Sequence, residues 1–327
     1  MTTPMPLITA PYISPVTLLT APTGIDWTSI PVGDDITPAQ NEAEWWNMCA
    51  RATAKVDSYC NQILRATVDI EVLRGPDFRV TVGPGAGGAT RTPYWNNAGS
   101  NARAILSRFP ILEVTQVQVC PNNTWPRQWT TLPTGWAEPE YPPFGIFNSV
   151  APATDAYGGQ AIIIGPGFIN WCFGRNGYVI QVSYINGFPH AEITSSALAG
   201  ATTLSVSDVT GWGITSYQGT TGATGVIKDS GQQETVHASS TSVTSGPGTL
   251  TLSAPLVYPH APGTIITSMP ASIEQACILF ATAEALTRGA TTTTIHDIGG
   301  HSQNTGGDVV GLTTEAELLC HPYRRTI

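Results

Sequence analysis

The feature that most constrains this chain is one long helical pattern, AEWWNMCARATAKVDSYCNQIL, placed ahead of a long strand-like region. Thr37 suits the N-cap, Pro38 suits the first helical position, and Gln40 completes a capping box. The apolar residues that follow are spaced for one face of a helix, and they are Trp45, Cys49, Ala52, Val56, Tyr59 and Ile63. We therefore expect an amphipathic helix over residues 37–64 with one buried face.

Two large residues lie beside this stripe. Trp46 is about 100° around the helix from Trp45, so one helix face cannot bury both. Met48 also flanks the stripe and widens the apolar surface. Packing of this helix under a sheet would account for the apolar stripe, but it would leave Trp46 and Met48 without a contact. We predict that Trp46 and Met48 contact a neighbouring subunit.

After this helix the period of the sequence changes to two. Between Thr67 and about Phe188, alternating segments such as TVDIEVL and YVIQVSYI are separated by Gly- and Pro-rich turns, which predicts an antiparallel β domain. Residues 191–267 alternate in the same way, and we expect a small barrel or sandwich. A second helix is expected from Pro270, stopped by Gly289. A short C-terminal helix is expected from Thr313 or Thr314.

These segments predict an α+β, β-rich fold. We expect a helical core of two main helices plus the short C-terminal helix, an antiparallel β domain and an inserted small β barrel or sandwich. The predicted domains are an extended Pro-rich arm (1–36), a core of helices and β domain (37–190 with 268–327), and the inserted β domain (191–267). An insertion requires that residues 187–190 and 268–270 lie close together.

Charge and cysteine content exclude several classes of function. The net charge is −9 with no basic cluster, which argues against tight binding to a phosphate backbone. Only 11% of residues are charged although nine are Trp, so we expect neighbouring molecules to cover much of the surface. The six scattered cysteines predict buried free thiols and a reducing compartment. We expect neither a membrane span nor a signal peptide.

Motifs for a cofactor or a metal are weak. GPGAGG places Gly83, Gly85 and Gly88 in a G-x-G-x-x-G pattern, but the next residues cannot open a helix, so a β-turn is expected. His296, Asp297 and His301 lie near one another without helical spacing, which favours a solvated loop over a metal site. We predict no cofactor and no metal.

Candidate catalytic residues are equally sparse. Glu138 and Glu140, near Trp136 and Tyr141, are the best candidates for a paired-carboxylate or sugar-binding site, although a solvated loop explains them as well. There is no G-x-S-x-G motif and no cysteine in a nucleophile context. We predict no catalytic residues and no enzymatic activity.

The order of the segments resembles one known family. A Pro-rich arm precedes the helix ending in DSYCNQIL, the segment FPILEVTQVQV and the strand YVIQVSYINGFP follow, and the chain closes with PASIEQACILFATAEALTRG and LTTEAELLCHPYRR. This order is similar to that of the head-to-tail connector proteins of long-tailed bacteriophages, also called adaptor or head-completion proteins. The resemblance covers about residues 37–190 and 268–327, and the β unit at 191–267 departs from compact members of the family.

The resemblance implies a structural virion protein of the phage neck, made in the host cytoplasm. It implies a ring of twelve copies under the portal protein that extends the DNA channel and docks a stopper or tail-terminator protein. DNA would pass through without sequence-specific binding, and no membrane is involved. The C-terminal segment would reach the portal, which makes these residues the portal-contact candidates: Leu318, Leu319, Tyr323, Arg324 and Arg325. We expect truncation after His321 to abolish this joining without changing stability.

Two alternatives remain open at this stage. The β units could bind glycans in a virion-surface or tail protein, or the chain could cleave polysaccharides through Glu138 and Glu140.

Overall fold

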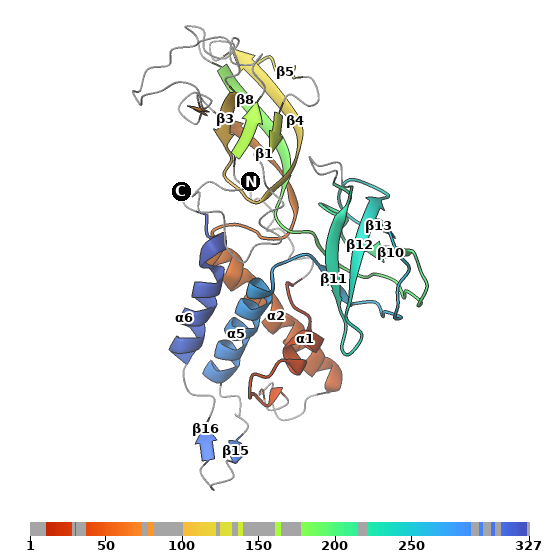
Figure 1. The fold of residues 1–327 in the computed structure, drawn as a ribbon. Coiled ribbons are helices and arrows are strands. Elements are labelled where there is room, and N and C mark those ends of the chain that lie inside the picture. Colours follow the sequence, from red (N-terminus) through yellow and green to blue (C-terminus); the bar gives the residue numbers. More distant parts are fainter. Residues whose placement is uncertain are drawn as a thin grey trace. The chain divides into compact units, whose positions relative to one another are not determined.

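The computed structural model describes residues 11–27, 30, 37–73, 78–81, 101–121, 125–132, 137–139, 161–164, 178–214, 221–288, 294–296, 302–304 and 309–325 (Figure 1). Helices and antiparallel sheets in this part make it an α+β protein. None of the helices in these ranges has the length and apolar character needed to cross a membrane.

The chain forms two compact units. The first comprises Met1–Leu64, Pro189–Gly213 and Gly222–Thr326, and the second comprises Arg65–Phe188 and Ile214–Thr221. This grouping places residues 222–267 with the helices, whereas the sequence grouped 37–190 with 268–327. Whether 191–267 is an independent domain stays a prediction. Its ends do meet, because the Ser268 N–H donates to the Pro189 carbonyl at 2.9 Å.

The predicted first helix is α2 (Pro38–Cys60), and its start is confirmed by the capping box of Thr37 and Gln40. It ends four residues earlier than expected. Asn61 adopts the left-handed conformation, with φ of 55°, and its N–H bonds back to the last turn. The buried side chains of α2 are Met48, Cys49, Ala52, Thr53, Val56 and Cys60.

Three further helices belong to the first unit: α1 (Pro15–Thr20), α5 (Ala271–Thr287) and α6 (Val309–Cys320), which continues into the 3₁₀ turn η3 (His321–Tyr323). Helix α5 is apolar on most sides and buried, because α2 and α6 both pack against it (Figure 1). Helix α1 corrects the expectation of a fully extended arm. Ser14 caps the N-terminus of this six-residue helix, and Pro15 occupies its first position. The fully buried Leu18 anchors the helix in the core.

The arm is held against α2 by Tyr12. Its backbone N–H donates to Thr53 Oγ1 at 2.9 Å, and its hydroxyl donates to Asp57 Oδ1 at 2.5 Å. The same hydroxyl accepts the Leu64 N–H at 2.9 Å. Tyr12 therefore satisfies the backbone just beyond the end of α2 and holds the arm against this helix.

The first unit also holds a six-stranded antiparallel sheet in the order β10-β13-β12-β11-β14-β9. Its strands are β9 (His190–Glu192), β10 (Thr203–Val206), β11 (Ala223–Lys228), β12 (Glu234–Thr241), β13 (Gly248–Leu252) and β14 (Ile265–Thr267). A bridge between Ile193 and Val206 connects the two edge strands. Trp212 is fully buried in the core of this sheet. A separate hairpin is formed by β15 (Thr294–His296) and β16 (Ser302–Asn304).

The second unit contains two four-stranded antiparallel sheets, ordered β1-β8-β4-β5 and β2-β3-β7-β6. The first consists of β1 (Thr67–Leu73), β8 (Tyr178–Asn186), β4 (Ile111–Pro121) and β5 (Thr130–Thr131). The second consists of β2 (Phe78–Thr81), β3 (Asn101–Ile105), β7 (Ala161–Ile164) and β6 (Ala137–Pro139).

Strand β1 turns its polar residues inward. Asp69 Oδ2 accepts from Asn186 Nδ2 at 2.6 Å, and Glu71 Oε2 accepts from the Tyr184 hydroxyl at 3.1 Å and from the Ser107 N–H at 2.8 Å. Burial and the nearby Glu71 carboxylate raise the pKa of Tyr184 above its usual value, so this hydroxyl stays a donor. Val68, Ile70 and Val72 consequently face outward, whereas Leu73 at the end of β1 is buried.

Candidate functional site

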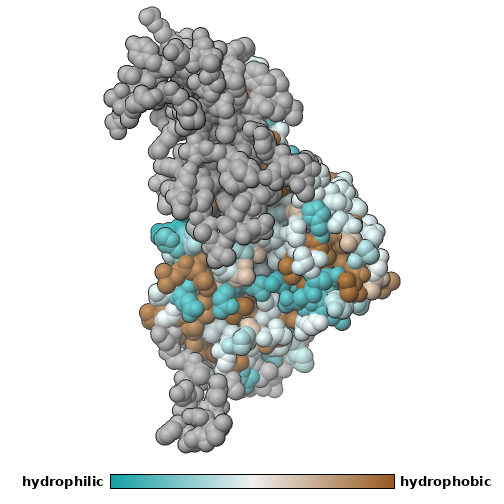
Figure 2. Space-filling view, in the orientation of Figure 1, coloured by the Kyte–Doolittle hydropathy of each residue, from teal (hydrophilic) through white to brown (hydrophobic). Residues whose placement is uncertain are grey.

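The five predicted portal-contact residues form two groups: Leu318 and Leu319 lie on α6, and Tyr323, Arg324 and Arg325 follow it in the C-terminal tail. Leu318 is 66% exposed, and Val310, two helical turns earlier, is 75% exposed. Leu319 is half-buried, and Ala316 and Cys320 face the core. Figure 2 shows apolar surface in the region of α6. An exposed apolar row on a helix is typical of a surface that another molecule covers.

Helix α6 begins at Val309, earlier than the expected start at Thr313 or Thr314. Gly311 weakens the helical pattern in the sequence, because Gly is unfavourable inside a helix. Thr313 Oγ1 and Thr314 Oγ1 each donate to the carbonyl four residues back, at 2.9 Å, so both threonines lie inside the helix and neither caps it. The earlier start adds Val310 to the exposed row, a residue that the sequence did not single out.

The C-terminal tail is docked on its own chain. The Arg325 N–H donates to the Cys60 carbonyl at 2.8 Å, and Gln62 Nε2 donates to the Tyr323 carbonyl at 2.9 Å. The Tyr323 hydroxyl lies 3.2 Å from Ser272 Oγ. The Arg324 guanidinium stacks over the Tyr59 ring at 5.3 Å. Burial raises the pKa of Tyr323.

This docking corrects one expectation. Three of the five portal-contact candidates, Tyr323, Arg324 and Arg325, have partners on α2, on α5 or just beyond α2. Truncation after His321 would remove these contacts, so the stability of the chain should fall. Leu318 is the candidate whose side chain is both exposed and uninvolved in the docking.

The two candidates on α2 also divide. Met48 is fully buried in the chain's own core, so it offers no surface to a neighbour and its assignment as an inter-subunit contact is wrong. Trp46 is half-buried and keeps part of its ring at the surface. Trp45 is half-buried as well, and its Nε1 donates to the Trp27 carbonyl at 3.3 Å.

A network of five charged groups joins α2 to α5. Arg51 Nη2 lies 2.7 Å from Glu44, Arg51 Nε lies 2.5 Å from Glu284, and Lys55 Nζ lies 3.2 Å from Glu284. Arg288 pairs with both carboxylates. Burial raises the pKa of Glu44, but hydrogen bonds from Arg51, Asn47 and Arg288 outweigh it, and the pKa is lowered. Three cations face two carboxylates, which leaves this helical surface with one extra positive charge.

The described thiols are all buried in the folded chain. Cys49, Cys60, Cys120, Cys277 and Cys320 are free and buried, as predicted. Burial raises the pKa of Cys49 to about 12 and that of Cys277 well above its usual value, so both stay protonated.

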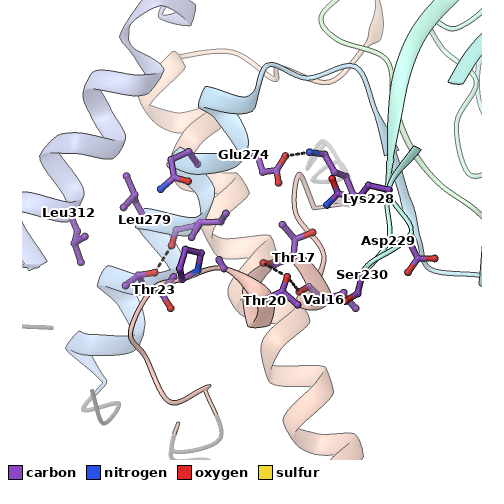
Figure 3. Close-up of a pocket in the computed structure, with 16 residues that line it drawn as sticks. Val16, Thr17, Thr20, Thr23, Lys228, Asp229, Ser230, Glu274, Leu279 and Leu312 are labelled. Carbon is purple, nitrogen blue, oxygen red and sulfur yellow. Dashed lines mark hydrogen bonds and ion pairs between the residues drawn. The ribbon is translucent and has the colours of Figure 1, made fainter. Parts of the chain in front are cut away.

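A pocket of about 370 Å³ lies in the first unit between α1, α5 and the end of β11 (Figure 3). Lys228 and Glu274 in its wall form an ion pair at 2.7 Å and neutralise each other. The rest of the lining that Figure 3 labels combines Asp229 and the hydroxyls of Ser230 and three threonines with Val16, Leu279 and Leu312. The Asp229 carboxylate of this lining lies 3.1 Å from Nδ1 of the buried His260.

A second cluster is structural. His260 is fully buried, with Nδ1 3.1 Å from Asp229 and Nε2 2.7 Å from Glu234. Both partners are carboxylates, which accept hydrogen bonds when ionised. Glu234 also accepts the Val257 and Tyr258 N–H groups at 2.9 and 3.2 Å. The cluster fastens the 253–264 loop to the β11–β12 hairpin.

The weak sequence motifs stay predictions. The Gly83–Gly88 segment, Asp297, His301, Trp136, Glu140 and Tyr141 lie outside the described residues, and Glu138 is placed only as a residue of β6. Within the described ranges, no group of three His, Cys, Asp or Glu is arranged to hold a metal ion.

Comparisons with protein-family models, with curated proteins and with solved structures found no match to this chain.

Proposed function

We propose that this protein is a structural component of the neck of a long-tailed bacteriophage. In this proposal it is a head-to-tail connector that forms a ring of twelve copies under the portal protein. The ring extends the DNA channel and docks the stopper or tail-terminator protein on its other side. The chain carries no catalytic activity and needs no cofactor.

The observation that carries the proposal is the packing of three helices from distant parts of the chain. Helices α2, α5 and α6 pack together, and α6 keeps Leu318 and Val310 at the surface. This supports a helical core whose C-terminal helix is held for docking. The proposal also rests on the order of segments in the sequence, which resembles that of the connector family.

The residues then take separate roles. Leu318 contacts the portal, and the docked tail from Tyr323 to Arg325 holds the end of α6 so that Leu318 stays presented. Trp46 lies against a neighbouring copy. The strands of 191–267, whose edges are joined at Ile193 and Val206, form a small barrel inserted into the core. The net charge of −9 lets DNA slide through the channel, because like charge prevents tight binding.

The test is a mass measurement with the portal protein of the same phage. The wild-type chain should join the portal as a ring of about twelve copies, the number that the resemblance implies. Leu318→Asp should weaken joining by about 2 kcal/mol or more, the size expected of an interface anchor. The matched control is Val257→Asp, because Val257 is 67% exposed and Leu318 66% exposed. Absence of any portal complex with the wild-type chain would refute the proposal.

Glycan binding is the second candidate, and one observation favours it. Trp125 is 87% exposed, and the nearby Trp129 carries Arg127 over its ring at 5.8 Å. An exposed aromatic ring can stack on a sugar. Binding of the wild-type chain to host polysaccharide, lost on Trp125→Ala, would support this function.

A further inference from the structure

Two of the buried thiols meet where two helices end. Cys60 is the last residue of α2 and Cys320 is the last residue of α6, and the C-terminal ends of these helices lie side by side in Figure 1. Both residues are fully buried. The Cys60 thiol donates a hydrogen bond to the Cys320 carbonyl, with the sulfur 3.8 Å from the oxygen. The fold therefore brings together two cysteines that are 260 residues apart in the sequence.

The two thiols also interact with each other. A hydrogen bond from the Cys60 thiol lowers the pKa of Cys320, whereas the same bond and burial raise the pKa of Cys60. Cys320 is therefore the member of the pair that ionises first, and the thiolate is the form of cysteine that attacks a disulfide. Cys49 and Cys277 differ from Cys320 in this respect, because burial raises the pKa of both.

Position on the helices favours this pair over a link to Cys277 in the same core. A disulfide requires a narrow range of distance and direction between its two cysteines. Helix ends fray, so Cys60 and Cys320 can adjust to that geometry. Cys277 lies inside α5, where the helix continues on both sides of it. The alternative is a purely structural role, in which the Cys60 thiol only satisfies the last carbonyl of α6.

The docked tail runs across the end of α2. It begins directly after Cys320 as η3, and the Arg325 N–H donates to the Cys60 carbonyl at 2.8 Å. Gln62 Nε2 donates to the Tyr323 carbonyl at 2.9 Å. Terminal segments open more readily than the core of a domain. Opening of this tail removes the segment that follows Cys320 and lies on Cys60, so it gives a small oxidant a route to both sulfurs.

We propose that Cys60 and Cys320 form a disulfide under oxidising conditions, when the docked tail opens and admits a small disulfide oxidant such as oxidised glutathione. The Cys320 thiolate attacks one sulfur of the oxidant and forms a mixed disulfide, and the released thiolate takes up the proton that Cys320 lost. Cys60 then gives up its proton, its sulfur attacks the Cys320 sulfur, and the second thiol leaves with that proton. The two cysteines are oxidised, the S–S bond of the oxidant is reduced, and α6 becomes cross-linked to α2.

The cross-link goes beyond the proposed function, because it forms whether or not the chain is a neck protein. A reducing cytoplasm keeps the pair as thiols during synthesis. In a virion that has left the host, oxidising surroundings would close the bond and fix α6, with Leu318, on the helical core. This last consequence alone rests on the proposed function.

Oxidised glutathione added to the purified full chain tests the proposal. Unfolded in N-ethylmaleimide, the oxidised chain should take up two fewer maleimide groups than the reduced chain, and a digest should contain a peptide pair that joins Cys60 to Cys320. The cross-link should raise the melting temperature by about 5 °C or more, because a link across a long loop restricts the unfolded chain. Cys60→Ala and Cys320→Ala should each abolish both effects. Cys49→Ala is the matched control, since Cys49 is equally buried on α2, and it should keep both.

The route through the tail has its own test. Tyr323→Ala removes the contact of the tail with Ser272, so the tail should open more often. The cross-link should then form about tenfold faster or more. A rate equal to that of the wild type would overturn opening of the tail as the route.

Three results would overturn the cross-link: no linked peptide in the oxidised wild-type chain, glutathione held on Cys320 without the link, or a link from Cys320 to Cys277. The peptide map is read on the wild type, so it does not depend on the folding of any variant. The portal protein takes no part in the experiment. A failed cross-link therefore leaves the neck function standing, and a failed portal complex leaves the cross-link standing.

Discussion

Replacing Tyr323 measures how firmly the C-terminal tail is docked. The Tyr323 hydroxyl lies 3.2 Å from Ser272 Oγ, and a hydrogen bond of this kind contributes about 1 kcal/mol. The ring is half-buried, which adds about 1–2 kcal/mol of apolar burial. Tyr323→Ala should therefore lower the free energy of unfolding by about 2–3 kcal/mol, and Tyr323→Phe by about 1 kcal/mol.

Urea unfolding followed by circular dichroism gives these values. A double-mutant cycle with Ser272→Ala isolates the hydrogen bond, and the coupling free energy should be about 1 kcal/mol. Tyr258 is the control, because it is 41% exposed and its replacement by Ala should cost less than about 0.5 kcal/mol.

A loss below about 0.5 kcal/mol for Tyr323→Ala would refute the docked tail, because that is the size of an ordinary surface substitution. It would restore the sequence-based expectation that truncation after His321 leaves stability unchanged. Because the tail is docked, a Tyr323 substitution changes the stability of the chain as well as its binding to the portal. A portal-binding assay of such a variant therefore cannot separate the two effects. Leu318→Asp is the cleaner variant for joining, since Leu318 takes no part in the docking contacts.

Three other predictions concern the first unit. Burial raises the pKa of Glu234, but hydrogen bonds from Val257, His260 and Tyr258 outweigh it, so the pKa lies below 4.5 in the folded chain. The unfolded chain then binds more protons, and the stabilisation by Glu234 is present above 4.5 and lost as the pH falls through the folded-state pKa. Glu234→Gln should lower the urea midpoint at neutral pH, and the difference from wild type should shrink in acid. Gly222 has φ of 101°, and an added Cβ would lie 1.7 Å from the Ala238 carbonyl oxygen, so Gly222→Ala should cost about 3 kcal/mol or more. Gly231 has φ of 74° with open space around it, and Gly231→Ala should cost only about 1 kcal/mol by thermal unfolding. Equal losses at the two glycines would contradict this. Replacing 191–267 by a short Gly/Ser linker should leave the helices folded, because the ends of the segment pair at His190 and Thr267; loss of the helical circular dichroism signal would show that the strands belong to the core.

Elements whose signals lie within a few residues could be predicted from the sequence. The start of α2 depends on Thr37, Pro38 and Gln40, which contact one another across a single turn. The start of α5 next to Pro270 was predicted from local signals in the same way. The sequence also predicted antiparallel strands from their period of two, although the period does not say which face is covered.

The orientation of strand β1 could not be predicted from the sequence, because it depends on tertiary contacts. Its alternation is plain in TVDIEVL, and the usual expectation is that Val68, Ile70 and Val72 face the core. The opposite holds, because Asn186 and Tyr184 on the adjacent strand satisfy the carboxylates of Asp69 and Glu71 inside. These partners are more than a hundred residues away in the sequence, at separations of 117 and 113.

The candidate contact surface on α6 and the C-terminal tail shows the same difference between local and long-range information. A short C-terminal helix bearing Leu318 could be predicted from the sequence, because helical periodicity is local. It could not determine that Tyr323 and Arg325 are docked, since their partners Ser272 and Cys60 come from other helices. Met48 was predicted at an interface because its burial in the core depends on contacts that the sequence does not show. Local hydrogen bonds and helical or strand periodicity depend on neighbouring residues. Burial and the pairing of polar groups depend instead on which distant segments the fold brings together.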